Sequence, residues 1–153
     1  MTRTLLIDTD TASDDAVALI MALRSKEVRV AAITVVAGNV PVAQATSNAL
    51  YTAELCGADV PVYSGAERPL LRKLVTADWF HGADGLGDHG YKPAKRRAEP
   101  DHAVDALIET VRKNPGIEIV TLCGIAVRQF RGFCKNSRRL VAGSRPTHVT
   151  LFH

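Results

Sequence analysis

The chain has 153 residues, a length that suits one domain with a substantial core and is short for two. Of these residues 46% are hydrophobic, and the formal net charge is +3. No stretch is long and apolar enough to cross a bilayer. In "MTRTLLIDTD" charged residues follow the apolar run too soon for a secretory signal peptide. We therefore expect a cytoplasmic protein. Three widely spaced cysteines fit neither a disulfide framework nor a paired zinc motif.

In chain order, the hydrophobic pattern alternates between strands and helices. Short apolar runs predict buried strands, and longer amphipathic stretches predict helices. The strands are expected over 4–8, 28–38, 60–65 and 117–123, and the helices over 14–23, 41–57 and 101–114. The polar, glycine-rich segment between the third strand and the last helix is typical of a long functional loop with some helix. This order predicts an α/β protein with a Rossmann-like open, mostly parallel sheet and helices on both faces.

The last part of the chain differs in composition. Residues 1–123 hold 13 of the 19 basic residues and all 16 acidic ones, whereas residues 124–153 contain no Asp or Glu. This basic tail shows no sustained helical period and no clear strand before "HVTLF". We therefore expect an ordered part over 1–123 and a divergent tail over 124–153. The tail is either a disordered extension or the product of a reading-frame change, of which we favour the second.

Four aspartates lie within eight positions after the first predicted strand. Asp8 and Asp10 alternate at the strand end, and Asp14 and Asp15 fall in the first turn of the next helix, which Ser13 is expected to cap. Ligands of open α/β sheets bind at the carboxyl ends of the strands. Because clustered carboxylates repel one another, a hard divalent cation with oxygen ligands is the favoured explanation. The alternative is a helix cap with solvated loop residues.

Two other metal motifs fit this turn less well. An EF-hand loop that starts at Asp8 would need a ligand where Ala12 stands and a glycine where Ser13 stands. The haloacid dehalogenase-type phosphatases use an Asp-x-Asp-x-Thr/Val pattern, and "DTDTA" matches its aspartates but not its last position. A metal-dependent phosphatase of that type stays open as an alternative function.

The stretch "LLIDTDTASDDAVALIMAL" strongly resembles the N-terminal signature of the inosine/uridine-preferring nucleoside hydrolases, Asp-x-Asp-x-x-x-Asp-Asp-Ala-x-Ala. The similarity continues in "AAITVVAGNV", "VPVYSGAERPLLRK", "HGADGLGD" and the "HAVDALIETVRKNP" helix that leads to "IEIVTLC". It spans about residues 4–123 in order, so it is far more specific than one motif. The resemblance implies that residues 1–123 are the N-terminal part of a nucleoside hydrolase domain.

The resemblance also implies roles for six residues. In that family a tightly bound Ca²⁺ holds the ribose hydroxyls and the water that attacks the anomeric carbon. By resemblance Asp10 and Asp15 are the calcium ligands, and Asp10 is also the general base. Asp14 and Asn39 would bind the ribose hydroxyls, and the nucleobase would lie near His81. Asp8 would hold the metal-binding residues in place without contacting the ion.

The chain departs from the family in two places. The family usually has Pro-Gly where this chain has Thr11 and Ala12, and because glycine adopts backbone angles that alanine disfavours, we expect a strained or shifted metal loop. After Cys123 the match ends. The family's second half, which supplies another calcium-binding aspartate and a histidine that protonates the leaving base, has no counterpart in "GIAVRQFRGF" and beyond.

The predicted function is calcium-dependent hydrolysis of the N-glycosidic bond of ribonucleosides to ribose and free base. The alternative within the same family is an inactive truncated remnant that at most binds calcium or a nucleoside weakly. The basic "KPAKRR" run lacks interleaved aromatic residues and is typical of a solvated face, so no nucleic-acid partner is expected. Because family members are often dimers or tetramers, a homo-oligomer is one expected state.

Overall fold

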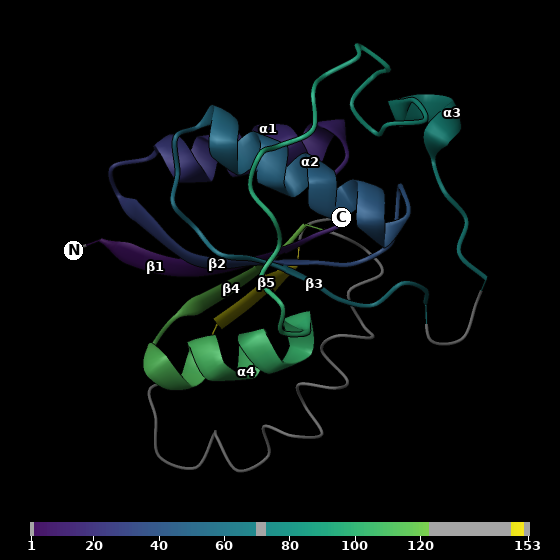
Figure 1. The fold of residues 1–153 in the computed structure, drawn as a ribbon. Helices are drawn as coiled ribbons and strands as arrows, with labels where there is room; N and C mark the ends of the chain where they lie inside the picture. The colour runs from purple at the N-terminus through teal and green to yellow at the C-terminus, as the bar shows by residue number, and fades with distance from the viewer. Residues whose placement is uncertain (1, 70–72, 123–147, 152–153) are drawn as a thin grey trace.

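The computed structural model describes residues 2–69, 73–122 and 148–151. Their strands form one parallel five-stranded sheet in the order β3-β2-β1-β4-β5 (Figure 1). The strands are β1 (Arg3–Thr9), β2 (Val28–Val35), β3 (Val62–Ser64), β4 (Glu118–Thr121) and β5 (His148–Leu151). The helices are α1 (Ser13–Arg24), α2 (Val42–Leu55), α3 (Asp78–His81) and α4 (Ala103–Lys113). The predicted fold class is confirmed.

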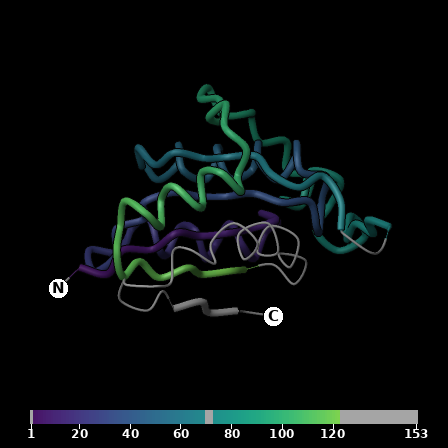
Figure 2. Tube along the Cα trace, turned by 90° about the horizontal axis from the view of Figure 1, so that it is seen from below, coloured from purple at the N-terminus to yellow at the C-terminus, as the bar shows by residue number. Residues whose placement is uncertain are grey.

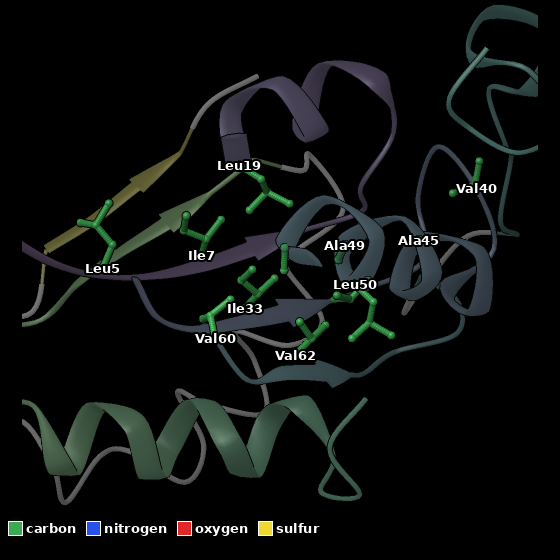
Figure 3. Close-up of a cluster of buried hydrophobic side chains, with 12 residues drawn as sticks. Leu5, Ile7, Leu19, Ile33, Val40, Ala45, Ala49, Leu50, Val60 and Val62 are labelled. Atoms are coloured by element: carbon green, nitrogen blue, oxygen red, sulfur yellow. The ribbon is translucent and has the colours of Figure 1, made fainter. Parts of the chain in front are cut away.

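Helices cover both faces of the sheet, with α1 and α2 on one side and α4 on the other (Figure 1). The face under α1 and α2 buries the larger apolar cluster, which includes Leu5, Ile7, Leu19 and Ile33 (Figure 3). Leu6 points to the opposite face, where it belongs to a smaller cluster with members on β4 and α4. Alternate residues of β1 are thus buried on both sides, which explains its continuous apolar run.

The carboxyl ends of the parallel strands meet at one edge of the sheet. Figure 2 shows β1 and β4 running side by side in the same direction. Backbone bonds extend the pairing just past the strands, since the amide of Val36 donates to the carbonyl of Thr9 at 3.0 Å and that of Leu122 to Asp8 at 2.9 Å. The turn that follows β1 is therefore held between the ends of β2 and β4.

Among its described residues, the predicted loop region contains one helix, the four-residue α3. It lies at the same end of the molecule as the strand ends (Figure 1). Of the predicted tail, only β5 belongs to the described residues, so the division of the chain at residue 123 stays a prediction. Among the helices that the structure describes, none has the length and apolar character needed to span a membrane.

Candidate functional site

Asp10 and Asp15 come together because the chain turns sharply between β1 and α1. The Asp15 carboxylate accepts hydrogen bonds from the Thr9 hydroxyl at 2.5 Å and from the Asp10 backbone amide at 3.2 Å. The Asp10 Oδ2 atom accepts from the backbone amide of Asn39 at 2.6 Å. Both aspartates are 4% exposed. The predicted pair of calcium ligands thus forms a buried carboxylate pair at the edge of the sheet.

Burial dominates the electrostatics of this pair. Loss of water contacts raises the pKa of Asp15 to about 8, and the negative charges of Asp10 and Asp14 add to the effect. Burial also raises the pKa of Asp10, against which the hydrogen bond from Asn39 acts. Two carboxylates that resist ionisation side by side are stabilised by a cation, which replaces lost hydration and cancels their repulsion.

The carboxylate pair fits part of a calcium site. The Asp10 Oδ1 atom is buried and has no hydrogen-bond partner among the described residues, so it is available as a metal ligand. The other oxygen of Asp10 packs directly on Gly38, where a Cβ atom would come within 1.8 Å of it. Calcium takes six to eight oxygen ligands, however, and within the described part of the chain no group of three or more metal-binding side chains gathers. These residues would supply only part of a coordination shell.

Asp8 occupies a different environment from Asp10 and Asp15. It is fully buried in β1 and pairs in register with Thr34 on β2 and Thr121 on β4. The Thr34 hydroxyl donates to Asp8 Oδ1 at 2.6 Å. A side chain enclosed in this way is suited to support the strand ends from within.

Asp14 and Asn39 are more accessible than the buried pair. Asp14 is exposed in the first turn of α1, and Asn39 is half-buried just after β2. The backbone of Asn39 is fixed on both sides, because its amide donates to Asp10 and its carbonyl accepts from Ala77 at 2.8 Å. Neither side chain hydrogen-bonds to another described residue, so both are available to a ligand.

The predicted helix cap at Ser13 is wrong. The cap position is Ala12, which has no side chain for capping, and Ser13 is the first residue of α1. The Ser13 hydroxyl instead lies 2.8 Å from Nδ1 of His81, which is 7% exposed at the end of α3. This contact brings the long loop onto the acidic turn.

Of the two alternatives for the metal loop, strain or a shift, the backbone at Ala12 shows no strain, and a shift stays a prediction. Its φ of −100° and ψ of −166° describe an extended conformation that any residue adopts, so the turn does not need the family's glycine.

Asn48 is a structural residue that the sequence did not reveal. It is buried in α2, and its Nδ2 donates to the carbonyl of Thr11 at 3.0 Å and to that of Asp84 at 2.8 Å. It thereby ties the acidic turn to the loop that follows α3. The available signal was a polar residue within the apolar stripe of a predicted helix.

A cavity of about 490 Å³ lies beside the acidic turn, under α1. Asp14 and Asp15 line one part of it, and most of the rest is apolar. The other lining residues come from α1, β1, β4 and the position after β4: Arg3, Leu5, Ile7, Ala18, Met21, Ala22, Val120 and Leu122. Asn39 and His81 do not line it, so this cavity does not unite the predicted ligand-binding residues.

Comparison with known proteins gives a consistent result. Residues 5–127 match the family described as inosine-uridine preferring nucleoside hydrolase. An uncharacterized protein of Schizosaccharomyces pombe is 44% identical over 79% of this chain and 39% of its own length. The probable uridine nucleosidase 2 of Arabidopsis thaliana is 37% identical over 91% of this chain and 46% of its own.

A solved structure shares the fold as well. The purine-preferring ribonucleoside hydrolase from Gardnerella vaginalis superposes with a TM-score of 0.87 and 28% identity, over 97% of this chain and 48% of that one. The chain therefore spans less than half of the length of each of these three proteins.

Proposed function

The chain belongs to the inosine-uridine preferring nucleoside hydrolase family, and we therefore propose that it serves in the calcium-dependent hydrolysis of the N-glycosidic bond of ribonucleosides to ribose and free base. The observation that carries this proposal is the buried Asp10–Asp15 pair at the carboxyl edge of the sheet. A cation would stabilise two buried carboxylates, one of which has an oxygen without a hydrogen-bond partner. The family that the chain matches is described as acting on nucleosides.

Asp10 and Asp15 would hold the calcium ion. When bound, the ion supplies a positive charge that orients sugar hydroxyls and makes a bound water more acidic. By resemblance to the family, Asp10 would also take the proton of that water as general base. The hydrogen bond from Asn39 to Oδ2 fixes the orientation of the same carboxylate.

The remaining residues would bind and orient the nucleoside. Asp14 would accept hydrogen bonds from the ribose hydroxyls, and the side-chain amide of Asn39 would both donate to them and accept from them. His81 would face the nucleobase. Negative charge from Asp14 would also stabilise the positive charge that develops on the sugar as the base leaves. Asp8 would hold the end of β1 in place through its bond with Thr34.

A second candidate is a chain that binds calcium or a nucleoside without turnover. It is supported by the ligand set within the described residues, where no group of three or more metal-binding side chains gathers. The phosphatase alternative is not supported. The family match points elsewhere, and the aspartate that would act as its nucleophile, Asp8, is 0% exposed.

Release of ribose from inosine and uridine tests the proposal. We expect release in the presence of calcium, its loss after chelation and its loss in Asp10→Asn. No release, together with an increase in Tm on adding calcium, would support the second candidate. The absence of both would overturn the calcium site itself. A cytoplasmic location and a homo-oligomer stay predictions, and sedimentation analysis measures the latter.

A further inference from the structure

A hydrogen bond between a hydroxyl and an imidazole joins the start of α1 to the end of α3. Ser13 and His81 are 68 residues apart in sequence, yet Oγ lies 2.8 Å from Nδ1. We propose that Ser13 is a positioning residue that donates to Nδ1 and thereby keeps the proton of the neutral ring on Nε2. His81 then presents a hydrogen-bond donor to an acceptor atom of the nucleobase. The identity of that ligand rests on the proposed function.

The role of Ser13 is not that of a helix cap. A capping serine accepts a hydrogen bond from a backbone amide within the first turn of its helix. α1 has no side-chain cap, and Ser13 lies one position too late to provide one. Its hydroxyl instead hydrogen-bonds to the imidazole ring of His81, which lies on a distant segment of the chain. Because Asp14 follows directly in sequence, the same contact fixes the ring relative to the proposed sugar site.

Counting donors and acceptors within the protein favours one polarity of this hydrogen bond. A neutral imidazole has one N–H and one acceptor nitrogen, and a serine hydroxyl both donates and accepts. Within the described residues, His81 is the hydrogen-bond partner of the Ser13 side chain. Donation to Nδ1 gives the hydroxyl proton an acceptor within the protein, whereas the opposite polarity would leave that proton to solvent, to which Ser13 is exposed. The bond made by one ring nitrogen sets the protonation of the other, which gives the Nε2–H form.

The second ring nitrogen is open to a ligand. Nε2 has no hydrogen-bond partner among the described residues. It does not belong to the fully buried side-chain atoms that lack a partner, so it keeps some exposure to solvent. The rest of the residue is held firmly. Its ring packs edge-on against Phe80 with centroids 4.8 Å apart, its amide donates to Ala77 at 2.9 Å, and its carbonyl accepts from Gly87 at 2.7 Å. A fixed ring with one free donor selects bases that present a carbonyl oxygen or an unprotonated ring nitrogen.

Nitrogen NMR of the metal-free chain tests the positioning without any ligand. Long-range ¹H–¹⁵N spectra distinguish the two neutral tautomers, and they would be recorded about two pH units above the ordinary pKa of histidine. We expect the Nε2–H form in the parent chain, a mixture of tautomers in Ser13→Ala, and the Nε2–H form again in Ser13→Thr, which keeps the hydroxyl. Backbone amide spectra check that all three chains are folded alike. An Nδ1–H ring in the parent chain, or the same ratio in Ser13→Ala, would overturn the proposal.

Nucleoside binding tests the ligand. With calcium present, we expect Ser13→Ala to bind inosine or uridine about tenfold more weakly than the parent chain, and Ser13→Thr to bind like the parent. If the parent and Ser13→Ala bind equally well, the donor role is wrong. If the parent binds neither nucleoside, the proposed function and the assigned ligand fail, while the NMR result still decides whether Ser13 positions the ring.

Discussion

Gly38 determines where the Asp10 carboxylate can lie. A Cβ at this position would come within 1.8 Å of Asp10 Oδ2, and such an overlap forces the carboxylate to move. We predict that Gly38→Ala lowers the free energy of unfolding by about 1–3 kcal/mol and removes the increase in Tm on adding calcium. Gly57→Ala is the control. Gly57 has a φ of +62° and no atoms within 4 Å of the place that a Cβ would take, so its change should destabilise the chain yet leave the calcium response intact. Equal calcium responses in both variants would contradict the prediction.

Asp15 is expected to cost stability when no metal is bound. Burial raises its pKa to about 8, so at pH 8 the folded chain either keeps a proton on Asp15 or bears a buried charge, whereas the unfolded chain ionises this group freely. In Asp15→Asn the amide oxygen can still accept from Thr9 and from the Asp10 amide, but the charge is gone. We predict that the metal-free variant is more stable than the parent at pH 8, by on the order of 1 kcal/mol, and gains nothing from calcium. Urea unfolding with and without chelator measures both effects, and a less stable metal-free variant would refute the argument.

Helix α2 acts as the support that joins the two halves of the site. Its Asn48 reaches the carbonyl of Thr11 in the acidic turn and that of Asp84 in the loop after α3. Asn48→Ala leaves both carbonyls without this donor, and we predict a loss of about 1–3 kcal/mol together with faster amide exchange in residues 82–88. Gln44→Ala is the control, since the partner of Gln44 among the described residues is the Asn48 side chain, and neither carbonyl loses its donor. Unchanged exchange in the loop would show that Asn48 does not hold it.

The elements could be predicted from sequence because their signals are local. The apolar run of β1 and the amphipathic pattern of α4 depend on neighbouring residues, and both elements form where they were expected. The partner of Ser13 could not be predicted in this way. Whether a serine caps a helix depends on a shift of one position and on a competing histidine 68 residues away. Asn48 was missed for the same reason, since its two acceptors lie 36 and 37 residues away.

The four aspartates of the acidic turn could be grouped from the sequence, but their separate environments could not be predicted. Sequence alone grouped four aspartates, but three-dimensional packing divides them. Asp8 is enclosed between neighbouring strands, Asp10 and Asp15 form the buried pair, and Asp14 is exposed. This division depends on which strand end lies beside each residue, and in particular on Gly38 and Asn39, which follow β2 rather than belonging to the turn.

For the molecule as a whole, the buried pair makes stability depend on pH and on calcium together. The pKa of Asp15 is raised from 3.8 to about 8 in the folded chain, and that of Asp10 is raised as well. The folded state therefore binds protons more tightly than the unfolded state does. The stabilisation is fully present below about pH 4 and is lost as the pH rises towards 8, by up to about 1.4 kcal/mol per pH unit for each proton concerned.

Calcium should weaken this dependence. Because the ion binds the ionised carboxylates, its binding competes with protonation, and the stabilisation that it gives should grow between about pH 5 and pH 8. We predict a metal-free Tm that falls over this range, a smaller fall with millimolar calcium, and proton release on calcium binding in calorimetry with buffers of different ionisation enthalpy. Asp15→Asn should flatten the metal-free profile. A metal-free Tm that rises steadily across the same range would mean that the carboxylate pair is already neutralised by other groups, and the case for a cation between Asp10 and Asp15 would fall with it.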